Sequence, residues 1–287
     1  MSLFRIAALL LGLLLAAPSH AAGAIGAQAL RARHASLGAE LARNDFGRPL
    51  ALRSQEAARR IEGDAYAVLE HPFARVSAAL ADPVQWCDIL ILHLNTKHCR
   101  LQAQPLPRLE VRVGKKQEQP LQAATLLAFG WQGAQARDDY LHVEMAAPDG
   151  PYDTRDYRLL VEAVPLEGGR TFLHMGYAFS YGGAGNLAMN VYLRTIARDK
   201  VGFTRLPAAD RPVGGMRGVV ERNTMRYYLA IESYLASLQA PPQQQLEHRL
   251  GAWFDATENY SRQLHELERD EYLRMKRNEV RRQNGLR

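Results

Sequence analysis

The chain has 287 residues, a formal net charge of +6 and a pI near 9.4. This length is enough for one large domain with its own core, or for a domain with an extension. The positive charge is concentrated in the final segment, RMKRNEVRRQNGLR, and no strand interleaves basic with aromatic residues as in proteins that stack bases. We therefore expect no nucleic-acid binding, and the basic C-terminal segment is a candidate for peripheral contact with a membrane of anionic lipid.

Residues 1–21 have the pattern of a secretory signal peptide. One Arg precedes the uncharged apolar run IAALLLGLLLAA, and the small residues Ser19 and Ala21 follow at the spacing that favours cleavage after Ala21. The apolar run is shorter than the ~20 residues that span a bilayer, although an uncleaved anchor is the alternative. Arg far outnumbers Lys and Ala is abundant, as is typical of GC-rich bacterial genomes. We therefore expect export to the periplasm.

The next elements are a helical lead at 22–45, two strands at 49–55 and 61–70, and a helical segment at 72–90 that breaks at Asp82-Pro83. Both cysteines follow, in WCDILILHLNTKHC. Two cysteines in an oxidising compartment usually pair. The spacing of Cys87 and Cys99 suits neither a redox Cys-x-x-Cys nor a zinc knuckle, so a disulfide is favoured over two free buried thiols or a metal site.

A β-rich stretch comes next. RLEVRVGKK, QAATLLAFGW and YLHVEMAA are predicted strands, and 154–182 is predicted to form a hairpin that turns at PLEGGR. GGAG at 182–185 precedes a predicted helix at 186–200, and a long amphipathic helix follows to Leu238. Its apolar stripe shares helical spacing: Met216, Val220, Asn223, Tyr227, Ile231, Tyr234 and Leu238. Residues 241–287 are predicted to be a charged helical tail.

This order of elements predicts an α+β fold, with an antiparallel sheet closed by a long helix. From Arg48 to Leu238 the chain resembles the START-like superfamily, also called SRPBCC, helix-grip or Bet v 1-like proteins. Three stretches carry the resemblance: GDAYAVLEHPFARVSAALADPVQWCDIL, YDTRDYRLLVEAVPLEGGRTFLHMGY and GVVERNTMRYYLAIESYL. The resemblance implies a curved antiparallel sheet that grips the C-terminal helix around a hydrophobic cavity. We expect this domain to span 46–240.

The resemblance implies binding or transfer of a hydrophobic ligand, such as a lipid, a sterol or hopanoid, or another isoprenoid. The inward faces of the hairpin and the long helix predict the residues that contact this ligand, with 186–200 as a gate to the cavity. The predicted contacts are Tyr157, Leu159, Val161, Leu173, Met175, Tyr177, Phe179, Val220, Tyr227 and Ile231. No metal or cofactor is expected.

Two other functions remain open. The same superfamily contains polyketide cyclases and dehydratases, for which the polar candidates here are Arg155, Asp156, His174 and Arg226, with His93 as a general base. Alternation along the hairpin predicts that Asp156 and His174 face away from the cavity. The second alternative is a non-catalytic envelope protein that acts through its tail, in which Trp253 and Phe254 are placed to dock on the domain or on a membrane.

Overall fold

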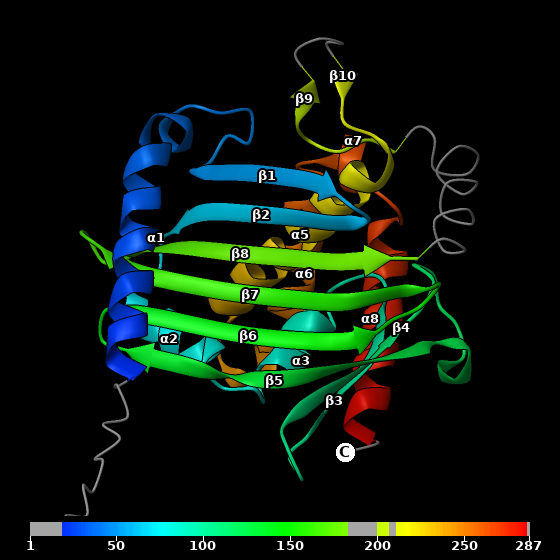
Figure 1. Ribbon diagram of the computed structural model, residues 1–287. Helices are drawn as coiled ribbons and strands as arrows, with labels where there is room; N and C mark the ends of the chain where they lie inside the picture. The colour runs from blue at the N-terminus through cyan, green and yellow to red at the C-terminus, as the bar shows by residue number, and fades with distance from the viewer. Residues whose placement is uncertain (1–18, 183–199, 207–210, 286–287) are drawn as a thin grey trace, which may run out of the picture.

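The computed structural model describes residues 19–182, 200–206 and 211–285. The chain builds one curved sheet of eight antiparallel strands, with helices on both of its faces (Figure 1). The strand order is β1-β2-β8-β7-β6-β5-β4-β3, and a two-residue pair, β9 and β10, lies apart from the sheet. The strands of the sheet are β1 Leu50–Ala57, β2 Arg60–Leu69, β3 Thr96–Gln102, β4 Arg108–Val113, β5 Thr125–Arg137, β6 Tyr140–Asp149, β7 Thr154–Leu166 and β8 Arg170–Tyr181. This layout confirms the predicted α+β class and the helix-grip arrangement.

The hairpin β7–β8 lies near the centre of the sheet and pairs Val161 with Met175. Its turn passes through Gly168 and Gly169, whose φ angles of +73° and +69° lie in the left-handed region that glycine enters without a steric penalty. Successive residues of each strand point to opposite faces, so the hairpin presents one set of side chains to each layer of helices.

One face of the sheet is covered by α1 (Ser19–Ala42), which crosses in front of the strands in Figure 1. Apolar side chains of α1, including Leu30, Leu37 and Leu41, are buried against Val164 and Phe172 of the hairpin. The helical lead predicted for 22–45 is therefore a packed layer on this face of the sheet. None of the described helices is long and apolar enough to cross a bilayer.

The other face carries the remaining helices (Figure 1). The predicted break at Asp82-Pro83 separates two short helices, and the long predicted helix follows later in the chain. The helices on this face are α2 Phe73–Leu80, α3 Trp86–Leu90, α5 Gly215–Ser237, α6 Gln245–Glu258, α7 Ser261–Leu264 and α8 Arg269–Gly285. The first two and α5 pack with the sheet into one large apolar core.

Helix α5 is enclosed on all sides rather than on one stripe. From Met216 to Ser237 no side chain is exposed. Glu221 and Arg222, which lie off the predicted apolar stripe, are buried as well. The Glu221 carboxylate accepts hydrogen bonds from the Ser54 hydroxyl (2.5 Å) and from the backbone N–H of Thr204 (2.9 Å). The helix has no solvent face because α6 packs on the side opposite the sheet.

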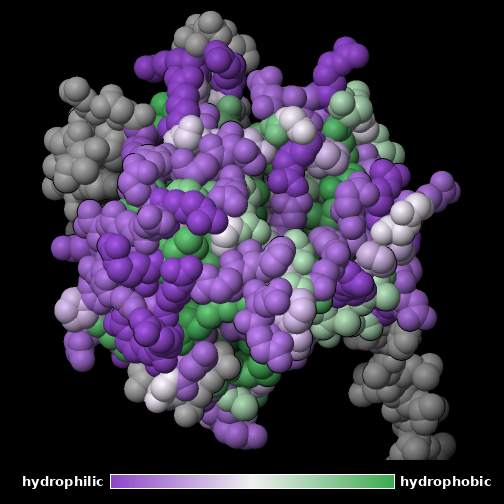
Figure 2. Space-filling view, turned by 180° about the vertical axis from the view of Figure 1, so that it is seen from behind, coloured by the Kyte–Doolittle hydropathy of each residue, from purple (hydrophilic) through white to green (hydrophobic). Residues whose placement is uncertain are grey.

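The C-terminal helices are layers of the core rather than a solvated appendage, which differs from the expectation for a charged tail. Leu250, Trp253 and Tyr272 are buried in the same apolar core as the sheet. The Trp253 indole N–H donates to the Arg226 carbonyl of α5 (3.1 Å), and its ring stacks on Tyr272. Figure 2 shows this side of the molecule from behind, where hydrophilic surface predominates and hydrophobic side chains show in the gaps. Trp253 therefore docks the tail on the domain.

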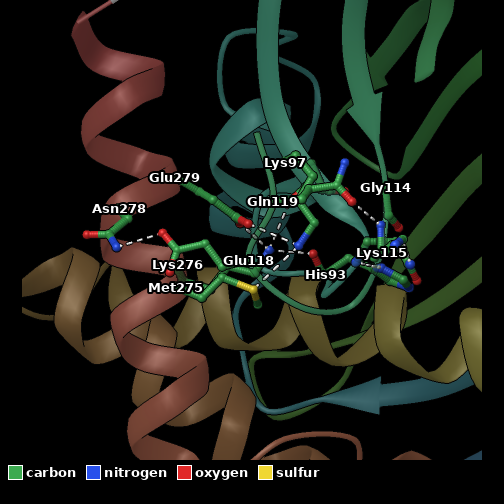
Figure 3. A network of polar contacts seen from close by, with 12 residues as sticks. His93, Lys97, Gly114, Lys115, Glu118, Gln119, Met275, Lys276, Asn278 and Glu279 are labelled. Carbon is green, nitrogen blue, oxygen red and sulfur yellow. Dashed lines mark hydrogen bonds and ion pairs between the residues drawn. The ribbon is translucent and has the colours of Figure 1, made fainter. Parts of the chain in front are cut away.

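A buried charge cluster joins α8 to β3 (Figure 3). The Glu279 carboxylate accepts from the Lys97 ammonium (3.0 Å) and from the Lys276 ammonium (2.7 Å), and all three side chains are at most 1% exposed. Lys276 also donates to the carbonyls of His93 and Thr96. Burial lowers the pKa of both lysines, that of Lys276 to about 8, although Glu279 opposes the shift. One carboxylate thus compensates two buried ammonium groups.

The disulfide between Cys87 and Cys99 is confirmed, with a Cα–Cα distance of 5.2 Å. It ties α3 to β3 on the face that α8 covers. Next to it, the backbone N–H of Cys99 donates to the side-chain carbonyl of Gln283 (3.0 Å). The cysteine stretch is therefore the place where α3, β3 and α8 are fastened together.

The substitution Cys87→Ser should lower stability without changing the fold. Closing a loop of 12 residues is worth about 3 kcal/mol in the chain-entropy model. For a domain of this size the loss corresponds to a fall of about 6–12 °C in Tm, measurable by differential scanning calorimetry. Reduced wild-type protein serves as the control and should melt with the variant. Equal melting of oxidised wild type and Cys87→Ser would contradict the role of the bond.

The substitution Glu279→Gln should be far more damaging than its charge suggests. It leaves two buried ammonium groups without a carboxylate, a change that typically costs about 3–5 kcal/mol. Glu247→Gln is the matched control. Glu247 of α6 pairs with Arg277 of α8, but at the surface, where such pairs are worth less than about 1 kcal/mol. Urea unfolding of both variants measures the difference. Similar losses for the two would show that the cluster does not hold α8.

Candidate functional site

An aromatic interior lies between the sheet and α5. The inward face of the hairpin supplies Tyr157 from β7, and Tyr177 and Phe179 from β8. The ring of Tyr157 stacks on that of Phe179 at 5.3 Å, and the Tyr177 ring lies 5.8 Å from the Phe179 ring. Phe129 of β5 meets Tyr157 edge-on at 6.3 Å. These residues gather because alternation places every second side chain of three strands on the same face.

Helix α5 and the loop after α3 complete this interior. The Tyr227 ring lies 5.2 Å from that of Tyr177, and the His93 ring stacks on Tyr227 at 4.7 Å. A continuous series of rings therefore runs from β5 through the hairpin and α5 to His93. We call these six residues the aromatic interior: His93, Phe129, Tyr157, Tyr177, Phe179 and Tyr227.

The aromatic interior contains a few polar atoms among its rings. The Tyr157 hydroxyl bonds to the Thr154 hydroxyl (2.7 Å). The hydroxyls of Tyr177 and Tyr227 make no hydrogen bond within the described part of the chain, and burial raises the pKa of both well above its usual value. Tyr227 nevertheless keeps some accessible surface. These groups are neutral donors at any physiological pH.

His93 is the titratable group of this region. Its Nδ1 accepts from the backbone N–H of Asn95 (3.1 Å), while its buried Nε2 has no hydrogen-bond partner of normal geometry among the described residues. Asn223 lies close enough to favour protonation weakly, but burial and then the Arg226 and Lys276 cations hold the His93 pKa well below 6.5. The imidazole is therefore neutral, and Nε2 carries the hydrogen because Nδ1 accepts.

The structure brings together the predicted ligand contacts in one core, seven from the hairpin on the α5 side of the sheet and three from α5 itself. Nine are buried and Tyr227 is partly buried. Two surface hollows, of about 940 Å³ and about 330 Å³, are lined by other residues. The role of the ten side chains as ligand contacts stays a prediction, and the expected gate at 186–200 lies, except for Lys200, outside the described residues.

The polar candidates for an enzyme are scattered rather than gathered. Arg155 and Asp156 are exposed at a bulge in β7. Arg226 is buried and donates to the carboxylate of Glu266 (2.9 Å), which lies in the segment between α7 and α8. In the described part of the chain no group of three or more His, Cys, Asp or Glu side chains is placed to hold a metal ion.

His174 lies on the face that α1 covers, as alternation predicts. Its two ring nitrogens contact the carboxylates of Asp64 (2.8 Å) and Glu162 (2.9 Å). Burial disfavours its charged form, but hydrogen bonds to Asp64 and Glu162 outweigh this effect and raise the His174 pKa. It is a buried ion-pair centre on the opposite side of the sheet from the aromatic interior.

Sequence reasoning missed Phe129 as a member of the aromatic interior and named His93 only as a general base. The alternation of LLAFGW carried a signal for Phe129, because Leu127 and Phe129 share the buried face of β5. No local pattern identifies His93, since it lies in the turn after α3 and reaches Tyr227 from a part of the chain more than a hundred residues away.

No family model and no curated protein matches the chain. Solved structures do show similarity. Ara h 8.0201 matches with 9% identity over 65% of this chain and 99% of its own, at a TM-score of 0.38. Truncated norcoclaurine synthase from Thalictrum flavum matches with 8% identity over 52% and 88%, at 0.34. The lipid transfer and protein localization domain of human StarD13 matches with 8% identity over 47% and 71%, at 0.32. The chain is similar to these proteins in fold alone, and its helix-grip layout rests on its own sheet and on α5.

Proposed function

We propose that this protein is exported to the periplasm, where it binds a hydrophobic ligand between the sheet and α5 and carries it through water. The ligand class is a lipid, a sterol or hopanoid, or another isoprenoid. The observation that carries the proposal is the aromatic interior, in which large rings surround a few neutral polar groups, among them His93 Nε2, which has no hydrogen-bond partner of normal geometry among the described residues. Ligand sites have this composition, because apolar lining supplies affinity and a few polar groups supply orientation.

The polar atoms define what the ligand would present. Neutral His93 offers an Nε2–H donor, and the Tyr177 and Tyr227 hydroxyls offer donors or acceptors. No charged side chain belongs to the aromatic interior, so an uncharged hydroxyl or carbonyl on an apolar body fits it better than an ionised group. Enclosing such a body would remove its apolar surface from water at about 25 cal/mol per Å².

Contact with a membrane is the second part of the proposal. Lys276 is buried and Arg277 pairs with Glu247, but Arg274 and Arg281 are exposed on α8. Their spacing of seven residues, about two turns, places them on one side of the helix. Two guanidinium groups on one side would attract an anionic membrane surface and bring the ligand site to it.

A neutral apolar probe tests the ligand site. We expect N-phenyl-1-naphthylamine to bind saturably with increased fluorescence. A total lipid extract of bacterial membranes should displace it. Tyr227→Trp should weaken probe binding at least about fivefold, because overpacking the site costs about 1–3 kcal/mol. Circular dichroism verifies the fold of the variant.

Tyr66→Trp is the matched control, since Tyr66 is also a partly buried tyrosine but lies on the α1 face against His174. This variant should bind the probe as the wild type does. Equal weakening by both substitutions, or no saturable binding by the wild type, would contradict a ligand site between the sheet and α5.

A further inference from the structure

A second site is indicated by a surface cleft of about 940 Å³ that the aromatic interior does not reach. The cleft lies where the end of α1 and the loop after it meet β1, the β9–β10 pair (Arg205–Leu206 and Arg211–Pro212), the start of α5 and the α6–α7 junction. Its volume is in the range of small-molecule sites. It is therefore large enough to take a ligand of its own.

The cleft is rich in guanidinium groups. The described residues that line it include five arginines and two carboxylates, and the arginines are Arg43, Arg53, Arg205, Arg217 and Arg262. Glu40 is engaged by Arg53 through a hydrogen bond of 2.7 Å and a second, shorter contact. The two exposed side chains Arg43 and Arg262 have no ion-pair partner among the described residues. Arg43 and Arg262 are thus the guanidinium groups of the cleft that are best placed to pair with an anionic ligand.

Arg217 is held in place by hydrogen bonds to Ser54 of β1. Arg217 donates from Nε to the Ser54 hydroxyl (3.1 Å) and from Nη2 to the Ser54 carbonyl (3.1 Å). Ser54 in turn donates to the buried Glu221 carboxylate (2.5 Å), which also accepts from the backbone of Thr204. This chain of bonds links β1, α5 and the segment before β9. The guanidinium group is therefore fixed at the wall of the cleft before any ligand arrives.

Three aromatic rings form the apolar part of the same cleft. Phe46, Phe203 and Tyr260 lie within 5.7–6.1 Å of one another, each from a different segment of the chain. All three are partly buried and line the cleft. A ligand that touches both the rings and the arginines must combine an apolar part with an anionic part.

We infer that this cleft binds a phosphate-bearing amphiphile, with the phosphate against the arginines and the first part of the apolar chain against the three rings. Arginine suits this role because its planar fork donates two parallel hydrogen bonds to a phosphate. The site is distinct from the aromatic interior, whose polar atoms are neutral, and the inference does not depend on the proposed function. The same phosphate chemistry could come from a lipid headgroup or from free phosphate, which the experiment separates.

Isothermal titration of the full mature chain at low salt tests the inference. The probes are dihexanoyl phosphatidic acid below its micelle concentration, inorganic phosphate, and dihexanoyl phosphatidylcholine. We expect phosphatidic acid to bind more tightly than either of the others. R43Q/R262Q should weaken its binding at least about tenfold, because charge-assisted hydrogen bonds are lost. R75Q/R170Q is the control, since it removes two exposed arginines, of α2 and of the start of β8, that do not line the cleft, and it should change nothing.

Several results would overturn the inference. Equal affinity for inorganic phosphate would make the cleft a plain anion site, and equal affinity for phosphatidylcholine would show that the anionic charge is not recognised. Equal weakening by the two double variants would show a general effect of net charge. Displacement of N-phenyl-1-naphthylamine by phosphatidic acid, unchanged in R43Q/R262Q, would place the amphiphile in the aromatic interior. Failure of probe binding alone would leave the cleft intact and contradict only the proposed function.

Discussion

The structure depends on the enclosure of α5 between the sheet and the C-terminal helices. A helix with a polar outer face can rest on a sheet and leave the rest of the chain free, but α5 also buries Arg222 and Arg226, which lie off its apolar stripe. Each buried polar group needs a partner, because leaving one unpaired costs free energy. Glu266 provides that partner for Arg226. The C-terminal segment is therefore required by the sequence of α5 itself.

The same requirement explains how α8 is held. The Glu279 carboxylate bonds to Lys97 of β3 and to Lys276 of α8, so it links the helix to the strand at one register. Removing one partner of such a buried cluster is costly because it leaves the other charges uncompensated. The disulfide lies beside this cluster. Cys99 and Lys97 both belong to β3, so the disulfide and the ion pairs hold the same strand. Together they close the side of the domain where His93 reaches the aromatic interior.

Much of the fold could be predicted from the sequence because its main signals are local. The alternation of Leu159, Val161 and Tyr157 is visible within one strand, and so is the helical spacing of Val220, Tyr227 and Ile231. The disulfide was predicted from the expected export and from the spacing of the two cysteines. The burial of Lys276 and Glu279 could not be predicted, because a charged helix is normally solvated and their partner Lys97 lies far away in the sequence. The same holds for the candidate site. The hairpin tyrosines could be predicted from local alternation, whereas His93 could not, because its place depends on a contact between distant segments.

We propose above all that the protein encloses an apolar molecule. Native mass spectrometry of the protein purified from its native cells, followed by organic extraction, can decide this. We predict the mass of the polypeptide plus that of one stoichiometric apolar molecule, which extraction releases. A mass without any addition, with no uptake when the protein is offered membrane extracts, would contradict the account and show that the aromatic side chains simply fill the core.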